Sequence, residues 1–275
     1  MANKGLQFEH AVMYVVKSSI IGNKSSEDQR NFDGAASQWD SIPQDIKITA
    51  ENIVMEFSPA SIPNQQEYFK SFKKMSGGGE EPKTDILFIK GGKKYKCSMK
   101  WGKSFQLSSA GVDKSVQVFQ KVLEKSMKEC SGSTSKNALG YIQSMLEQIT
   151  EHFENSTGTM DQPTAKRLLA NTKNTGGLQE QLKIVLGSKK VPSVGEAYYC
   201  FKRNLTHECM TGAMLFNNDD RAANYLFTEK GIKPIDNKAV DEVMSVAGVR
   251  LALKGRGKDP TSGVRRNAIS IRYEV

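Results

Sequence analysis

An aspartate, a serine and a lysine flank a pair of glycines in the most informative stretch of this 275-residue chain. Asp85 begins a strand-like run that ends at Gly91-Gly92, and a second strand-like run contains Ser98 and Lys100. Two such runs around Gly-Gly predict a β-hairpin, because a type I′ turn needs positive φ at both central residues. A two-residue turn pairs Asp85 with Ser98, and strand alternation then puts Lys100 on the same face.

A carboxylate beside a lysine on one sheet face has two interpretations. The first is a surface ion pair, worth well under about 1 kcal/mol. The second is a phosphodiesterase centre in which Asp85 binds Mg²⁺ or Mn²⁺ through oxygen. Lys100 would position the attacking water and offset charge on the phosphate, while Ser98 would hydrogen-bond water or metal-bound solvent. The alternate positions are expected to pack into a core: Ile86, Phe88, Cys97, Met99 and Trp101.

The run Pro82-Lys83-Thr84-Asp85, followed after twelve residues by Ser98-Met99-Lys100, resembles the PD-(D/E)XK nuclease superfamily. That motif has an Asp at a strand start, then Asp or Glu, any residue and Lys on the next strand. The resemblance implies a restriction-endonuclease-like sheet and metal-dependent DNA cleavage. The first helix of this superfamily often supplies a Glu, which makes Glu9 a candidate metal ligand. Residues 100–111 look like the continuation in phage-type members, which adds Gln106.

Ser98 stands where the superfamily has an acid, and serine is a poor metal ligand. Three outcomes stay open: Glu9 replaces the missing carboxylate, Gln106 lends its carbonyl oxygen, or the site is inactive. The expected function is metal-dependent hydrolysis of DNA phosphodiester bonds, by an endonuclease rather than an exonuclease. The alternative is a non-catalytic nucleic-acid-binding or phage assembly protein on a degenerate nuclease fold.

The net charge of +9 is concentrated in two segments. Residues 83–103 hold seven lysines and one acid, and residues 250–275 hold seven basic residues and two acids. Local positive charge of this kind indicates a polyanion partner, here double-stranded DNA. The expected phosphate contacts are Lys96, Lys103, Arg256, Lys258, Arg265 and Arg266.

Hydrophobic periodicity and turn signals predict a mixed α/β fold, with a nuclease-like core over 1–111 and a largely helical extension over 112–275 that returns strands to it. The predicted helices are 5–21, 39–57, 64–75, 112–129, 138–153, 165–170, 178–186 and 195–216. The predicted strands outside the hairpin are 223–227, 249–253 and 268–273. Loops are predicted at 23–37, 77–82 and 155–163, and a flexible basic loop at 254–260.

The composition, with 38% apolar and 25% charged residues, excludes collagen-like, fully disordered and disulfide-scaffold proteins. Four cysteines without CxxC spacing predict reduced thiols and no zinc site. No apolar run approaches the roughly 20 residues of a membrane-spanning helix, and Glu9 and His10 interrupt any signal peptide. A cytoplasmic protein is therefore expected, in the bacterial host if the chain is phage-encoded. Many members of the superfamily dimerise to cut both DNA strands, so the resemblance also implies a homodimer.

Overall fold

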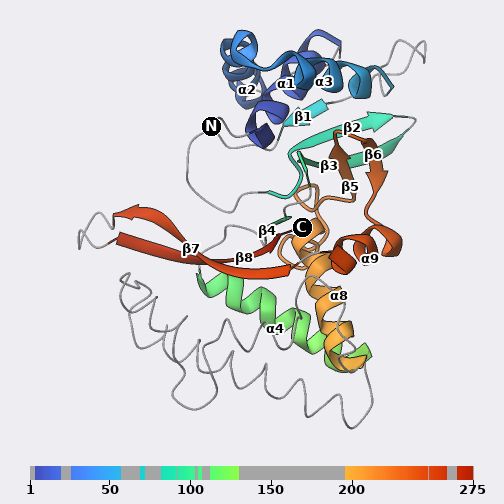
Figure 1. Ribbon diagram of the computed structural model, residues 1–275, viewed down its shortest axis with the longest axis vertical. Helices are drawn as coiled ribbons and strands as arrows, with labels where there is room; N and C mark the ends of the chain where they lie inside the picture. Colours follow the sequence, from blue (N-terminus) through green and yellow to red (C-terminus); the bar gives the residue numbers. More distant parts are fainter. Residues whose placement is uncertain are drawn as a thin grey trace. The chain divides into compact units, whose positions relative to one another are not determined.

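The chain divides into two compact units in the computed structural model, and both contain helices and strands (Figure 1). The first unit comprises Met1–Ser104 and Thr211–Ile235, and the second comprises Phe105–Met210 and Asp236–Val275. This mixture confirms the α/β class. The structure describes residues 4–19, 26–56, 69–71, 82–90, 92–102, 105–106, 112–129, 196–246, 248–258 and 265–274.

Three helices open the first unit: α1 (Lys4–Ser19), α2 (Ser26–Gln38) and α3 (Gln44–Glu56), with the 3-10 turn η1 (Trp39–Ser41) before α3. The predicted helices over 5–21 and 39–57 are confirmed in outline. The loop predicted over 23–37 is wrong, because α2 occupies most of it. Phe32 and Ala35 are buried among its described side chains, but the helix is mostly polar and contains Gly34, a composition typical of a loop.

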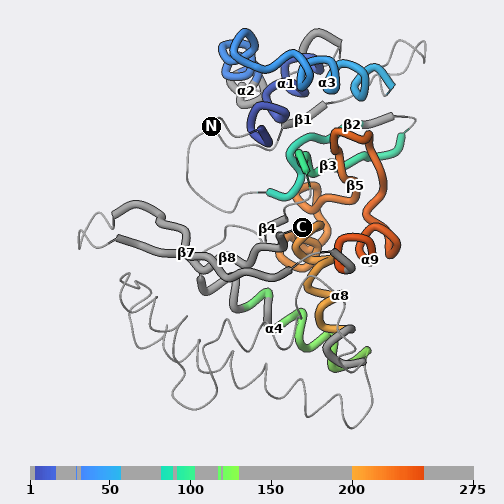
Figure 2. The backbone as a smooth tube through the Cα atoms, viewed as in Figure 1, coloured from blue at the N-terminus to red at the C-terminus, as the bar shows by residue number. Residues whose placement is uncertain are grey.

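Five strands form one mixed sheet in the order β1-β2-β3-β5-β6. They are β1 (Phe69–Ser71), β2 (Ile86–Lys90), β3 (Lys93–Lys100), β5 (Tyr225–Thr228) and β6 (Gly231–Pro234). The pair β3–β5 is parallel and the other pairs are antiparallel. Strand β5, from late in the sequence, lies beside β3 in Figure 1 and Figure 2, and β6 pairs with the other edge of β5. The helix predicted over 64–75 is wrong at 69–71, where hydrogen bonding to β2 makes an edge strand.

The hairpin of β2 and β3 has the predicted register, which pairs Ile86 with Cys97 and Lys90 with Lys93. Gly92 has a φ of +72°, the left-handed conformation that the turn requires. The predicted core face is confirmed as well. Its members Ile86, Phe88, Cys97 and Met99 are buried in the main cluster, and Trp101 packs against it.

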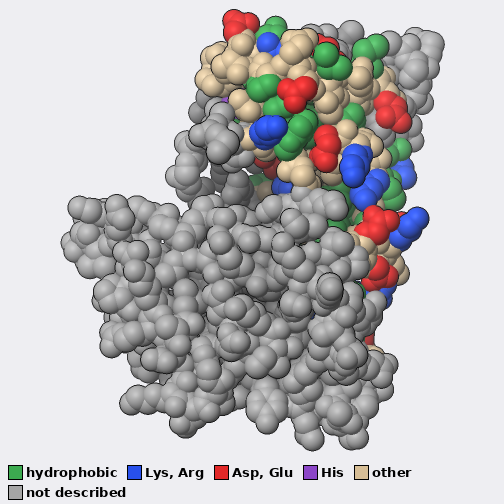
Figure 3. Space-filling model, viewed as in Figure 1, with side chains coloured by type: hydrophobic (Ala, Val, Ile, Leu, Met, Phe, Trp, Pro, Cys, Tyr) green, Lys and Arg blue, Asp and Glu red, His purple; other side chains and the backbone are tan. Residues whose placement is uncertain are grey.

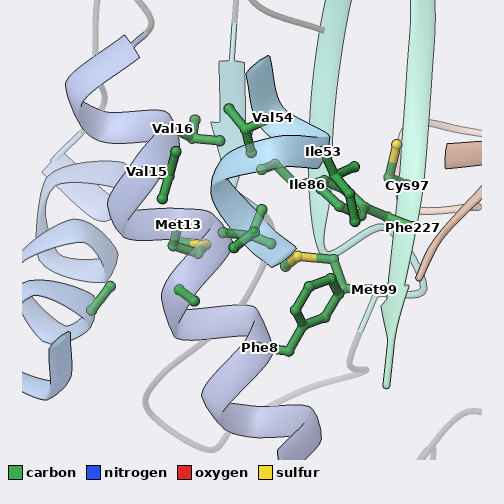
Figure 4. Packing of buried hydrophobic residues seen from close by; sticks show 14 of the residues in the cluster. Phe8, Met13, Val15, Val16, Ile53, Val54, Ile86, Cys97, Met99 and Phe227 are labelled. Carbon is green, nitrogen blue, oxygen red and sulfur yellow. The ribbon is translucent and has the colours of Figure 1, made fainter. Parts of the chain in front are cut away.

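Helices α1 to α3 lie together on one face of this sheet, and the core fills the space between them (Figure 1). Figure 4 shows Phe8 of α1 beside Met99 of β3, and Ile53 of α3 beside Ile86 of β2. The Phe8 ring lies 5.7 Å from the ring of Phe227 in an edge-to-face arrangement. Burial of these side chains holds α1 on the sheet.

The second unit contains α4 (Val112–Glu129), α8 (Glu196–Thr211, whose last residue belongs to the first unit) and α9 (Asn237–Val246). Its three-stranded sheet has the order β4-β8-β7, with β4 (Phe105–Gln106), β7 (Gly248–Lys258) and β8 (Arg265–Glu274). The helix at 112–129 and the strands at 249–253 and 268–273 are confirmed. Residues 77–81 and the predictions between 138 and 186 lie outside the described residues.

Two expectations for the second unit are wrong. Residues 254–258 are not a loop, because pairing with β8 continues β7 to Lys258, across a register shift that begins after Gly255. Cys200 of α8 is disulfide-bonded, whereas Cys97 and Cys209 are free. Disulfide formation depends on approach in space, which cysteine spacing did not reveal. None of the helices in the described part of the chain combines the length and hydrophobicity needed to cross a membrane.

Candidate functional site

Asp85 lies directly before β2 and is bound to β3 by both its backbone and its side chain. Its N–H donates to the carbonyl of Cys97 at 2.9 Å. Its Oδ2 accepts a hydrogen bond from the Met99 N–H at 2.7 Å. The carboxylate is therefore held against the end of β3.

Lys100 completes the pair that the hairpin register predicted. Its Nζ lies 3.8 Å from Oδ2 of Asp85 and donates to the Met99 carbonyl at 2.9 Å. The side chains of Asp85 and Lys100 are 15% and 25% exposed. The pair is thus reachable from solvent yet partly desolvated, which strengthens the electrostatic interaction between the two groups.

Ser98 lies on the same face but is 1% exposed. Its register partner on β5 is Leu226, which is also buried. The Oγ of Ser98 and the Oγ1 of Thr84 have no hydrogen-bond partner among the described residues. Buried hydroxyls normally have one, so an unsatisfied group of this kind points to a bound water or ion. The Ser98 hydroxyl can hydrogen-bond to a buried water or ion, but it is not accessible to bulk solvent.

Burial governs the charge state of the Cys97 thiol. Desolvation, and then the negative charge of Asp85, raise the pKa of Cys97 well above its usual range. Cys97 therefore stays protonated at neutral pH and offers neither a nucleophile nor a metal ligand.

Glu9 is half-buried in α1, next to Phe8. The Phe8 ring lies 5.3 Å from the ring of Trp101, so this part of α1 packs near the end of β3. However, α1 covers the core face of the sheet, and strand alternation puts Asp85 and Lys100 on the opposite face. Glu9 therefore lies near the same end of the sheet as Asp85 and Lys100, but on the opposite face.

Glu229 is an acid at this edge that sequence reasoning missed. Strands β3 and β5 run parallel, with Lys100 opposite Thr228, so both strands end together. Glu229 follows directly, and its Oε2 accepts a hydrogen bond from the Gly102 N–H at 3.2 Å. Only the long-range pairing of β3 with β5 reveals this proximity.

The donor atoms around Asp85 suit a hard cation held by few protein ligands. Within the described ranges, no group of three or more His, Cys, Asp or Glu side chains could hold a metal ion. Mg²⁺ often binds through one or two carboxylates and takes its remaining oxygens from water and substrate phosphate. The Asp85 carboxylate and the unsatisfied Ser98 hydroxyl fit that mode.

The positive charge of the hairpin is partly neutralised by a segment far along the chain. Lys94 Nζ lies 2.8 Å from Oδ2 of Asp220. Lys96 Nζ donates to the carbonyls of Asn218 at 3.2 Å and Asp219 at 2.9 Å. Acidic and basic side chains are accordingly interspersed on the described part of the face in Figure 3. The ammonium of Lys96, a predicted phosphate contact, is engaged within the protein.

The remaining predicted residues belong to the second unit or lie outside the described residues, as Lys103 does. Gln106 is in β4, opposite Arg272 of β8. Four predicted phosphate contacts are on the paired strands β7 and β8: Arg256, Lys258, Arg265 and Arg266. The structure therefore places them on a ribbon rather than in a loop.

Gly212 supports the segment that leads into Asp85. It has a φ of +64°, and a Cβ there would lie 2.6 Å from Cγ of Lys83 and 3.0 Å from the Phe216 ring. Gly212→Ala is expected to lower the free energy of unfolding by about 2–4 kcal/mol, from backbone strain and overpacking. Urea unfolding would measure this loss.

Gly92→Ala is the matched control, since Gly92 has a similar φ of +72° with no atom within 4 Å of an added Cβ. It should cost only the backbone strain, about 1 kcal/mol. Equal losses in the two variants would show that Lys83 does not pack tightly on Gly212.

The candidate site thus comprises the Asp85–Lys100 pair and the buried Ser98 hydroxyl, and Glu229 lies at the same edge of the sheet, bonded to the Gly102 N–H. A carboxylate and an ammonium so placed can hold a divalent cation and a phosphate together. Comparison with known protein families, curated proteins and solved structures finds no match to this chain.

Proposed function

We propose that this protein is a metal-dependent nuclease that hydrolyses DNA phosphodiester bonds at Asp85 and Lys100. The observation that carries the proposal is the 3.8 Å approach of Lys100 Nζ to Oδ2 of Asp85. The hairpin register predicted that these two residues would share a face, and their spacing resembles the PD-(D/E)XK pattern, with Ser98 in place of its acid. The mixed sheet with helices on one face is compatible with a nuclease core.

Each residue of the site has a role that follows from its position. Asp85 would hold Mg²⁺ or Mn²⁺, and the Met99 N–H fixes the orientation of its carboxylate. The bound metal would polarise the phosphate and acidify a water molecule. Lys100 would position the attacking water and stabilise the negative charge that develops on the phosphate. The Ser98 hydroxyl would bind a buried water beside them.

Cleavage assays with the full chain test this function directly. Linear duplex, supercoiled and single-stranded DNA would be incubated with the protein in Mg²⁺, Mn²⁺ or EDTA. We expect cleavage with either metal and none in EDTA, with nicked or linearised supercoiled DNA as the mark of an endonuclease. Intact DNA and RNA under every condition would refute the proposal.

A second candidate is a nucleic-acid-binding or assembly protein on the same core without catalysis. Ser98 in place of an acid, with no cluster of three metal-ligating side chains among the described residues, favours it. This candidate predicts a salt-sensitive mobility shift of DNA that is the same in Mg²⁺ and EDTA, with no cleavage.

A further inference from the structure

The turn between β5 and β6 places a second lysine at the edge of the sheet where Lys100 lies. Thr228, the last residue of β5, pairs with Lys100 on β3 and with Gly231 on β6. Glu229 and Lys230 therefore form the two-residue turn of a hairpin whose tip lies at this edge. Neighbouring strands are about 4.8 Å apart and successive Cα atoms about 3.8 Å apart, so the Cα atoms of Lys230 and Lys100 lie within about 13 Å of each other.

Hydrogen bonds inside the turn and across to β3 hold Lys230 in this place. The Lys230 N–H donates to Oγ1 of Thr228 at 3.2 Å. The N–H of Gly102, just after β3, donates to Oε2 of Glu229 at 3.2 Å. The first bond orders the turn, and the second joins it to the segment that follows Lys100. The fold therefore sets the position of Lys230 relative to the end of β3.

The ammonium of Lys230 is available to an anion, whereas those of two lysines in β3 are engaged. The Lys230 side chain is exposed, and its ammonium forms no ion pair or hydrogen bond with the residues that the structure describes. In contrast, Lys94 is paired with Asp220, and Lys96 donates to backbone carbonyls. A cation that is held at a fixed place without a counter-charge is suited to contact a phosphate.

We propose that Lys230 binds a DNA phosphate that neighbours the cleaved one, so that the substrate strand runs across the ends of β3 and β5. This inference rests on the proposed function, in which Asp85 and Lys100 hold the scissile phosphate. Lysine contacts to phosphate carry no base-sequence information, so Lys230 sets the position of the strand and not the sequence that is cut. Lys230 is a substrate-binding residue and takes no part in the chemical step.

Fluorescence anisotropy with a labelled 25-base-pair duplex in EDTA, at several salt concentrations, tests this contact without cleavage. Loss of one phosphate contact lowers the slope of log K against log salt by about 1. We therefore expect Lys230→Gln to weaken binding about tenfold in about 50 mM salt and less at higher salt. Lys230→Arg should bind as the wild type does. The matched control is Lys93→Gln, which removes an exposed cation at the other end of β3 and should leave the slope unchanged.

Steady-state cleavage separates the role of Lys230 from that of Lys100. A contact to a phosphate that does not react is equally strong in the ground state and the transition state, so Lys230→Gln should raise KM about tenfold and leave kcat unchanged. An unchanged salt slope in Lys230→Gln, or a loss equal to that of Lys93→Gln, would overturn the phosphate contact and leave the nuclease proposal standing. Binding that depends on Lys230, without cleavage by the wild type, would refute the nuclease and keep Lys230 as a phosphate contact.

Discussion

Lys100→Met is expected to lower the rate of DNA cleavage at least about a hundredfold. Methionine keeps much of the apolar stem but removes the ammonium 3.8 Å from Asp85. Removing one preorganised donor to a developing negative charge typically costs a factor of 10²–10³. Single-turnover cleavage at saturating protein and Mg²⁺ would measure the effect on chemistry apart from binding.

Lys93→Met is the matched control for Lys100→Met. Lys93 begins the same strand, is exposed and lies at the other end of β3 from Asp85. Its ammonium contacts the rings of Tyr95 and Tyr225 instead. Cleavage by the Lys93 variant should stay within about twofold of the wild type. Equal rates for the two methionine variants would exclude Lys100 from the chemistry.

Ser98→Asp is expected to make the stability of the protein depend on a divalent metal. Position 98 directly precedes Met99, whose N–H donates to Oδ2 of Asp85, and it is 1% exposed, so the new carboxylate would be buried close to Asp85. Two neighbouring carboxylates, one of them buried, repel each other and lose hydration, at a cost of about 3 kcal/mol without metal. Mn²⁺ binding between them would recover most of that loss. Melting temperatures in EDTA and in Mn²⁺ would measure the difference.

Ser98→Asn controls for the size of the new side chain, since asparagine matches aspartate in shape without the charge. Its melting temperature should be the same in EDTA and in Mn²⁺. If Ser98→Asp were destabilised equally with and without Mn²⁺, Asp85 and position 98 would not share a metal site. The second candidate function would then be favoured.

The candidate pair could be predicted because the hairpin is local. A Gly-Gly turn sets the pairing of its flanking strands, and the two-residue alternation of a strand assigns each side chain to a face. The positions of Asp85, Ser98 and Lys100 on one face, and of Ile86 and Met99 on the other, follow from these rules. The chemical roles of these residues stay predictions.

The elements that sequence reasoning missed depend on partners far along the chain. Helix α2 is polar in composition, and its described side chains include the buried Phe32 and Ala35. Strand β1 has three residues and forms by pairing with β2. The last residues of β7, with their glycines and cations, have the composition of a loop and become strand by pairing with β8. Tertiary contacts override local propensity at each of these places.

The β2–β3 hairpin, the approach of Asp85 to Lys100 and the location of the positive charge could be predicted, because each is encoded within a short span of sequence. The tertiary fold, in contrast, places β5 parallel to β3, Ser98 opposite the buried Leu226, and Glu229 beside Gly102. It also decided that Asp220 neutralises Lys94. These pairings join segments more than a hundred residues apart. Their formation depends on complementary packing that outweighs the entropy of closing a long loop, which no local pattern encodes.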